Sequence, residues 1–154
     1  MDTPATVKVL GTPPRWMNAV VRALLRVPGL NRILGRAFSV ITVTGARTGT
    51  RYATPVQHLE VDGRYVVLSQ RMRTWWRNLR TRPEVELLVQ GRMVRGRGSI
   101  AADAEASELL ATCLARQPRV ARFYGIRPGP DGSVDPAAVE ALLARVVVIV
   151  IDPD

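Results

Sequence analysis

The sequence holds few of the residues that build disulfides, metal centres or histidine-based catalytic sites. Cys113 is its only cysteine and His58 its only histidine, in a chain of 154 residues. An intramolecular disulfide, a zinc site of several cysteines and a histidine cluster are therefore all excluded. No serine lies in the strained strand-to-helix turn that exposes the nucleophile of an α/β-hydrolase. A chain without obvious acid–base machinery favours a cofactor that carries the reaction itself.

Long hydrophobic runs are also missing. The longest stretch without a charged residue is Ala37–Ala46, which is far shorter than the roughly 20 apolar residues that span a bilayer. The first residues, MDTPATVKVL, lack the basic start and the long apolar core of a secretory signal. The chain length and the 47% hydrophobic content suit one globular domain. We expect a cytoplasmic protein with a reduced thiol.

Lysine is almost absent, although the chain is strongly basic. Lys8 is the only lysine among 22 basic residues, and the net charge is +9. Residues 1–100 hold 17 basic and 5 acidic residues, whereas residues 101–154 hold 5 and 8. The basic part predicts an anionic partner, either phosphates, a polycarboxylate, nucleic acid or a lipid surface. A GC-rich genome that favours arginine would give the same total without a ligand, so the placement of the charges matters more than their number.

The N-terminal segment has the periodicity of an amphipathic helix. Apolar residues recur at helical spacing from Trp16 to Val27, with arginines beside them, and Pro28-Gly29 interrupts the pattern. Such a helix either lies on an anionic membrane or packs its apolar stripe on its own domain. We assign residues 1–38 to this helical segment and residues 39–154 to a cofactor-binding barrel.

The middle of the chain predicts strands joined by tight turns, followed by two helices and a last strand. The dipeptides Asp62-Gly63 and Gln90-Gly91 are hairpin signals. The last strand lacks polar alternation, so we expect both of its faces to be buried. The strands are expected at residues 39–44, 55–61, 64–69, 85–89, 93–100 and 145–151. Antiparallel strands with such turns close readily into a barrel, and the predicted fold class is α+β with helices outside the barrel.

Three helices are expected around these strands. A short one covers residues 74–80, and a longer one runs from its capping residue Asp103 through Arg116. The last one starts at Asp135-Pro136, a capping residue followed by proline in the first turn, and ends near residue 144.

One loop between two predicted strands combines glycine with arginine. The segment Gly45–Pro55 reads GARTGTRYATP. Its glycines allow backbone amides to turn toward a ligand, and such amides suit phosphate oxygens when Arg47 and Arg51 add forked guanidinium groups. Ordinary hairpin loops also carry glycine and arginine, and the segment matches no nucleotide-binding fingerprint.

A second basic segment, Ser69–Leu79, reads SQRMRTWWRNL and leads into the predicted short helix. The N-terminus of a helix attracts anions, and Arg71 and Arg73 come just before the N-terminus of this predicted helix. Their positive charges are unfavourable there unless an anion lies between them, so the arrangement suggests an anionic ligand. Trp75 and Trp76 point in different directions on a short helix. We expect one to pack in the core and the other to cover a cleft, although core packing of both fits the sequence equally well.

The other candidates are an aromatic pair and two single residues. Phe123 and Tyr124 precede a loop rich in glycine and proline and form either a lid or a small core beneath that loop. His58 is expected to be a strand side chain rather than a catalytic base. Cys113, among apolar neighbours, is expected to be a small core residue.

Four motifs occur in order along the chain. They are VTGARTGTRYATPV, with the pattern G-x-R-T-G-x-R-x-x-x-P, then DGRYVVLS, then WWRNLRTRPEVEL, and last RVVVIVI. Together they resemble the deazaflavin-dependent nitroreductase family over about residues 15–151. The family consists of split β-barrel oxidoreductases of actinobacteria that are related to flavin-binding proteins of the pyridoxamine-phosphate-oxidase type. The resemblance implies a split antiparallel β-barrel of the FMN-binding type with flanking helices.

The resemblance also implies a cofactor and its contacts. Reduced coenzyme F420, a deazaflavin with a phosphodiester and a polyglutamate tail, would give a hydride to a quinone, a nitroaromatic or a similar acceptor. The residues expected around phosphate and tail are Arg47, Thr48, Gly49, Arg51, Tyr52 and Pro55. Those expected beside the ring are Ser69, Gln70, Arg71, Arg73, Trp75, Trp76 and Asn78. Tyr124 would face the substrate as the catalytic proton donor.

Some alternatives remain open from the sequence. The segment between Ser69 and Trp75 is shorter than the stretch rich in glycine that many members carry, and Arg47 stands where many have lysine. An FMN-binding protein or a non-catalytic carrier of a small molecule or lipid would share the barrel. The mixture of aromatic residues and arginine also admits a nucleic-acid binder, although no such motif occurs. Related barrels imply a homodimer, and the N-terminal helix implies peripheral contact with the inner face of the membrane.

Overall fold

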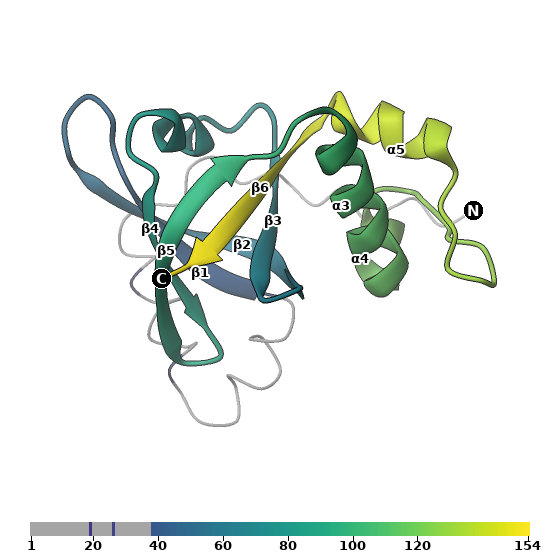
Figure 1. Ribbon diagram of the computed structural model, residues 1–154, viewed down its shortest axis with the longest axis horizontal. Coiled ribbons are helices and arrows are strands. Elements are labelled where there is room, and N and C mark those ends of the chain that lie inside the picture. The colour runs from purple at the N-terminus through teal and green to yellow at the C-terminus, as the bar shows by residue number, and fades with distance from the viewer. Residues whose placement is uncertain (1–18, 20–25, 27–37) are drawn as a thin grey trace.

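Six antiparallel strands form a closed barrel in the computed structural model, which describes residues 19, 26 and 38–154 (Figure 1). The strand order around the barrel is β1-β2-β3-β6-β5-β4, and β1 pairs with β4 to close it. The strands are β1 (Phe38–Thr44), β2 (Arg51–Val61), β3 (Arg64–Gln70), β4 (Glu84–Val89), β5 (Arg92–Ile100) and β6 (Val146–Pro153). The predicted antiparallel barrel with outer helices is confirmed.

The two predicted hairpin turns are also confirmed. Both residues of each turn have positive φ, namely Asp62 (52°) with Gly63 (76°) and Gln90 (47°) with Gly91 (76°). This geometry matches the right-handed twist of the strands on either side. The start of β2 was predicted too late, at Pro55. Pairing of β2 with β1 continues to Thr44 and Arg51, which leaves only residues 45–50 in the connecting loop.

The last strand is buried on both faces, as predicted. Val147, Ile149 and Ile151 point into the barrel interior together with residues of the other strands. The alternate residues of β6, from Val146 to Val150, pack against the helices outside. A strand with apolar contacts on both sides has no reason to alternate with polar residues.

Three helices cover the outer face of β3 and β6 (Figure 1), namely α3 (Asp103–Arg116), α4 (Pro118–Phe123) and α5 (Pro136–Leu143). The predicted cap of α5 is confirmed, because the Asp135 carboxylate accepts a hydrogen bond from the Ala137 amide at 2.9 Å. The predicted cap of α3 is wrong. Ala102 is the capping residue there, and Asp103 is the first helical residue with a φ of 51°. Helix α4 was not predicted, since its six residues are too few to show a clear period.

The predicted short helix before β4 is a 3₁₀ helix, η1 (Trp75–Arg80). A single six-residue 3₁₀ segment aligns few peptide dipoles, so the expected anion attraction by an α-helix N-terminus does not apply here.

The predicted amphipathic helix at residues 15–38 lies, apart from residues 19, 26 and 38, outside the described residues. The same holds for most of the predicted segment 1–38. Among the helices of the described residues, none is long and apolar enough to cross a membrane.

Candidate functional site

The loop between β1 and β2, residues 45–50, is a tight turn that we call the arginine loop. The Gly45 amide donates to the Thr50 carbonyl at 2.7 Å, and the Gly49 amide donates to the Gly45 carbonyl at 3.0 Å. A Cβ atom on Gly45 would lie 2.9 Å from Cε2 of Tyr52, and Gly49 has a φ of 70°. Both glycines of the motif therefore have a physical reason, one a close approach and the other a left-handed backbone. Arg47 and Thr48 are exposed at the tip of this loop.

Residues 70–80, which we call the tryptophan segment, lie at the same end of the barrel. Trp76 is only 4% exposed and packs among the interior residues, together with Leu79. The guanidinium carbons of Arg77 and Arg80 lie 5.5 and 5.6 Å from the centre of the Trp76 ring, within cation–π range. Trp75 is half-buried. Trp75 packs against the same interior cluster from nearer to solvent, so both tryptophans contact the core, and the cover of a cleft by one of them stays a prediction.

One hydrogen bond joins the arginine loop to the tryptophan segment. The backbone amide of Ala46 donates to Oδ1 of Asn78 at 3.0 Å. Nδ2 of Asn78 in turn donates to the Trp75 carbonyl at 2.9 Å. We predicted that these two segments form one site, and they are neighbours in the fold although 32 positions separate Ala46 from Asn78.

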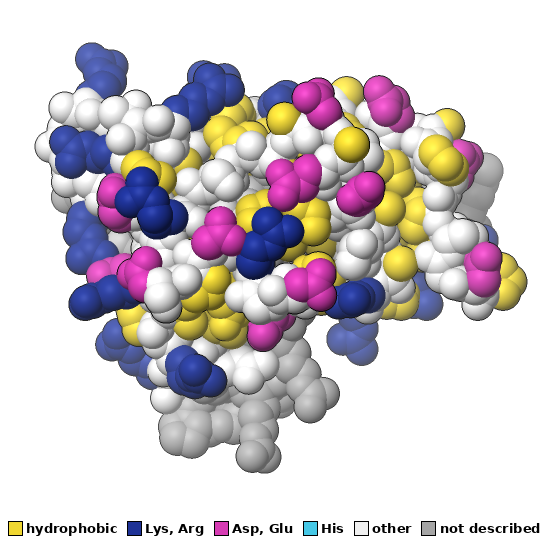
Figure 2. Space-filling view, viewed as in Figure 1, with side chains coloured by type: hydrophobic (Ala, Val, Ile, Leu, Met, Phe, Trp, Pro, Cys, Tyr) yellow, Lys and Arg dark blue, Asp and Glu magenta, His cyan; other side chains and the backbone are white. Residues whose placement is uncertain are grey.

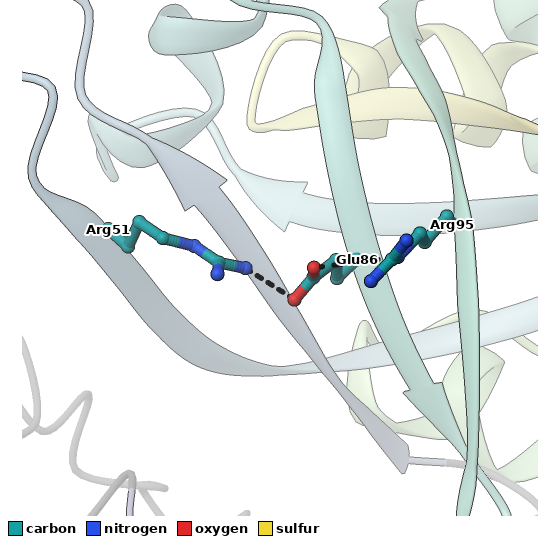
Figure 3. A network of polar contacts seen from close by, with 3 residues as sticks. All are labelled: Arg51, Glu86 and Arg95. Carbon is teal, nitrogen blue, oxygen red and sulfur yellow. Dashed lines mark hydrogen bonds and ion pairs between the residues drawn. The ribbon is translucent and has the colours of Figure 1, made fainter.

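Arg51, at the start of β2, is paired with a carboxylate on the outside of the barrel (Figure 3). Its guanidinium group bonds to Oε2 of Glu86, and Arg95 approaches Oε1 of the same carboxylate at 3.8 Å. Both arginine side chains are more than half exposed, so these ion pairs are screened by solvent. A phosphate that bound Arg51 would have to share it with Glu86, whereas Arg47 stands at the exposed tip.

Arg71, another predicted contact, is held by the backbone of a distant turn. Its guanidinium group donates to the carbonyls of Leu143 at 2.8 Å and Val146 at 3.2 Å, and its amide donates to the Arg145 carbonyl at 2.8 Å. Arginine at the end of a helix satisfies free carbonyls there. Arg71 thus fastens the start of the tryptophan segment to the turn between α5 and β6, and half-buried Arg73 follows it.

Three buried polar atoms of the tryptophan segment have no hydrogen-bond partner among the described residues. They are Oε1 of Gln70 and the Nε1 atoms of Trp75 and Trp76. A buried donor or acceptor without a partner costs about 1–3 kcal/mol. Donors and an acceptor left over within one short segment fit a flat ligand that carries both carbonyl and N–H groups. Ser69, at the end of β3, is 4% exposed, and its hydroxyl donates weakly to the Gln70 carbonyl at 3.3 Å.

Three further predicted residues, Thr48, Tyr52 and Pro55, lie in the arginine loop or in β2. The Thr48 hydroxyl bonds to the Thr50 hydroxyl at 2.9 Å inside the arginine loop. Tyr52 is 42% exposed beside Gly45. Pro55 lies further along β2, opposite Val40 of β1.

Tyr124 belongs to the outer core under the helices, whereas the tryptophans belong to the barrel interior. The Phe123 ring meets it edge to face, with ring centres 5.0 Å apart. Burial raises the pKa of the Tyr124 hydroxyl, and the nearby positive charge of Arg145 opposes this shift. The hydroxyl is therefore protonated at neutral pH, as a proton donor must be. Tyr124 and the two tryptophans thus pack in different hydrophobic clusters.

His58 is a side chain of β2 and Cys113 is a core residue, and both placements agree with the predictions. The His58 side chain is 6% exposed, and burial lowers its pKa. Cys113 is 1% exposed. A cavity of about 210 Å³ lies beside His58, Tyr65 and Arg92, at the end of the barrel opposite the arginine loop. It is separate from the pair of segments described above.

Charged side chains are spread unevenly over the face of the molecule in Figure 2. Figure 2 shows arginine side chains crowded over the barrel at the left, and acidic side chains over the helices at the upper right. The exposed arginines of the barrel side include Arg77, Arg80, Arg92, Arg95 and Arg97. Among the described residues, the barrel strands and η1 therefore carry more exposed arginines than the helices do.

Sequence reasoning missed the roles of Ala46 and Glu86, and it missed the close approach of Gly45 to Tyr52. Ala46 acts through its backbone amide, which no side-chain pattern reveals. The close approach behind Gly45 depends on where Tyr52 lies, and Glu86 reaches Arg51 across β1, which lies between β2 and β4. Of these three residues, only Gly45 offered a signal in the sequence, because it is a glycine of the loop motif.

Comparison with known proteins agrees with this geometry. The sequence matches the F420H(2)-dependent quinone reductase family over residues 16–125. No curated protein matches the chain. Among solved structures, an F420-H2 dependent reductase (FDR-A) is 16% identical with a TM-score of 0.53, over 75% of this chain and 94% of that one.

Two further structures share the barrel. A putative pyridoxamine 5'-phosphate oxidase from Listeria innocua is 14% identical with a TM-score of 0.51, over 90% of this chain and 94% of that one. A third, described as a domain-swapped dimer, is 16% identical with a TM-score of 0.54, over 88% and 96% of the two chains. The fold is thus the split barrel of the pyridoxamine-phosphate-oxidase type. On the strength of the match across most of its length, the chain belongs to the F420H(2)-dependent quinone reductase family, whose members are oxidoreductases that use coenzyme F420.

Proposed function

We propose that this protein binds reduced F420 between the arginine loop and the tryptophan segment and reduces a quinone or a similar electron-poor acceptor. The observation that carries the proposal is the hydrogen bond from the Ala46 amide to Asn78 Oδ1, which makes the two segments neighbours. Family membership supports the cofactor. When bound, reduced F420 supplies the hydride, and the protein supplies position and charge.

The residues fit such a cofactor in two ways. The exposure of Arg47 at the tip of its loop supports a contact with the phosphodiester or the glutamate tail, with Thr48 and the Gly49 backbone beside it. Gln70 and the two tryptophans offer polar atoms that lack partners among the described residues. Arg73 adds positive charge near Trp75, Ser69 lies beside Gln70, and Tyr52 and Pro55 flank the loop side.

Two of the predicted contacts act indirectly in this proposal. Arg51 is engaged by Glu86, and Arg71 by the carbonyls of Leu143 and Val146. Both side chains contribute positive charge to this end of the barrel while they hold strands and loops in place. Tyr124, protonated at neutral pH, remains the proposed proton donor to the reduced acceptor.

The proposal extends to partners. Pairing of two chains is supported by the similar structure described as a domain-swapped dimer, and sedimentation of the purified protein would test it. Peripheral contact of residues 15–38 with a membrane rests on their sequence pattern, and binding to anionic vesicles would test it.

Titration with F420, FMN and RNA tests the function. We expect F420 to bind tightly, and F420-dependent reduction of a soluble naphthoquinone to follow. The variant Arg47→Ala should bind F420 roughly 10- to 150-fold more weakly, which corresponds to one charged contact of about 1.5–3 kcal/mol. Arg92→Ala removes the same charge from an exposed position at the opposite end of the barrel and should bind like the wild type. Uptake of FMN without F420, or equal affinity of Arg47→Ala and wild type, would contradict the assignment.

A further inference from the structure

Asn78 contacts both halves of the proposed site through one short side chain. Its Oδ1 accepts from the Ala46 amide at 3.0 Å, and its Nδ2 donates to the Trp75 carbonyl at 2.9 Å. Its own carbonyl accepts from the amides of Thr81 at 3.1 Å and Arg82 at 2.8 Å. One residue therefore fixes the arginine loop, the start of η1 and the end of η1 with respect to each other.

We propose that Asn78 is a positioning residue that makes the arginine loop and the tryptophan segment bind the two ends of one ligand as a single unit. The inference rests on the proposed function, since the ligand is a deazaflavin with an anionic tail. Each polar atom of the carboxamide already holds one partner inside the protein, so the Asn78 side chain acts by holding the two segments together. Its effect passes through Arg47, the neighbour of Ala46, and through Trp75.

The chemistry of the position demands a carboxamide. The backbone amide of Ala46 can only donate, and the carbonyl of Trp75 can only accept, so the side chain must offer an oxygen to one and an N–H to the other. Aspartate keeps the acceptor, but it places a negative charge against the Trp75 carbonyl. Leucine has nearly the same size and keeps neither bond. These two partners also fix the orientation of the amide without ambiguity.

The tie matters because it joins the arginine loop directly to the segment, whereas each of them is otherwise held through the barrel. The arginine loop closes on itself through Gly45 and Thr50, and η1 is anchored in the barrel by Trp76 and Leu79. Between the two, the bond from Ala46 to Asn78 is the hydrogen bond that the described residues show. Without it the barrel keeps all six strand pairings, and only the distance between loop and segment becomes variable.

Coupling of this kind has a thermodynamic signature. A ligand held at both ends by a rigid site gains affinity from its second end at a high effective concentration, and this gain falls when the two halves move independently. A general loss of stability would weaken the binding of whole and truncated ligand alike. The tie should therefore control how much the tail adds to the affinity of the ring, rather than the affinity of the ring alone.

The experiment compares F420 with the deazaflavin that lacks the phosphodiester and the glutamate tail. The ratio of their dissociation constants is measured for wild type, Asn78→Leu, Asn78→Asp and Gln117→Leu. Gln117 is the matched control, because its amide donates to the His58 carbonyl at 2.9 Å, between the helices and β2. We expect Asn78→Leu to lower the affinity gained from the tail about tenfold, Asn78→Asp to lower it less, and Gln117→Leu to leave it unchanged.

Hydrogen exchange of the Ala46 amide, measured without any ligand, gives a second readout. It should become fast in Asn78→Leu and stay slow in the wild type. An unchanged tail contribution in both Asn78 variants, or an Ala46 amide that stays protected in Asn78→Leu, would overturn the positioning role. A wild-type protein that binds neither ligand would instead overturn the proposed function, and the positioning role with it.

Discussion

The substitution Gly45→Ala tests whether the shape of the arginine loop controls cofactor binding. The added Cβ would lie 2.9 Å from Cε2 of Tyr52, 3.2 Å from the Thr50 carbonyl oxygen and 3.3 Å from Oγ1 of Thr48. Tyr52 is 42% exposed, so its ring can swing outward. The Thr50 carbonyl is less free, because the Gly45 amide holds it at 2.7 Å.

The expected cost follows from these contacts. Overpacking at a tight site costs about 1–3 kcal/mol, and we expect the lower half of this range because the loop is partly exposed. The loop should shift by a few tenths of an ångström, which moves Ala46 and Arg47 away from Asn78. The affinity for F420 should fall on the order of tenfold, which equals about 1.4 kcal/mol.

Gly63→Ala provides a control of matched stability. Gly63 has a φ of 76° in the turn between β2 and β3, where a Cβ would meet nothing within 4 Å. A left-handed residue other than glycine costs about 1–2 kcal/mol, so both variants should lose similar stability in urea titrations. Only Gly45→Ala should lose F420 affinity in a fluorescence titration, because the eleven residues of β2 separate the two turns. Wild-type affinity in Gly45→Ala, or an equal loss in Gly63→Ala, would refute the reasoning.

Three further predictions concern stability and reactivity. Arg71→Ala removes two hydrogen bonds to carbonyls and should lower the free energy of unfolding in urea by about 1–2 kcal/mol. The control Arg73→Ala removes no side-chain hydrogen bond seen among the described residues and should change it by less than about 0.5 kcal/mol. Equal losses in the two variants would contradict the anchoring role of Arg71. Burial lowers the pKa of His58 in the folded protein, so as the pH falls the unfolded chain takes up a proton at this histidine before the folded chain does. The stability of the fold should therefore decrease as the pH drops below about 6.5. Thermal melts at several pH values would show this decrease, and His58→Gln should remove it. Burial raises the pKa of the Cys113 thiol to about 12, so a thiol reagent should fail to label the folded protein at neutral pH and should label it in denaturant; rapid labelling of the folded protein would contradict this burial.

Local rules predicted most of the barrel. The turns at Asp62-Gly63 and Gln90-Gly91 need two left-handed residues, and the apolar run of β6 reflects burial on both faces. These signals lie within a few residues of each other, so one sequence is enough to read them. The order of strands around the barrel depends on pairings such as β3 with β6, which are far apart in the chain and leave no local trace.

The site was less predictable, because its residues act through partners elsewhere in the fold. The sequence identified Arg51 and Arg71 as cations near a ligand, and it could not show that Glu86 and the carbonyls after α5 already hold them. It also identified two tryptophans without deciding between them. Their roles followed only from the way η1 seats Trp76 inside the barrel.

Hydrogen exchange with and without F420 tests the central claim most directly. The account predicts that the cofactor slows exchange in two separate segments at once, residues 45–50 and residues 75–80, in the wild-type protein. Residues around the cavity at the other end of the barrel, near His58 and Arg92, should exchange at an unchanged rate. Protection of only one of the two segments, or protection centred on the His58 end, would contradict the account.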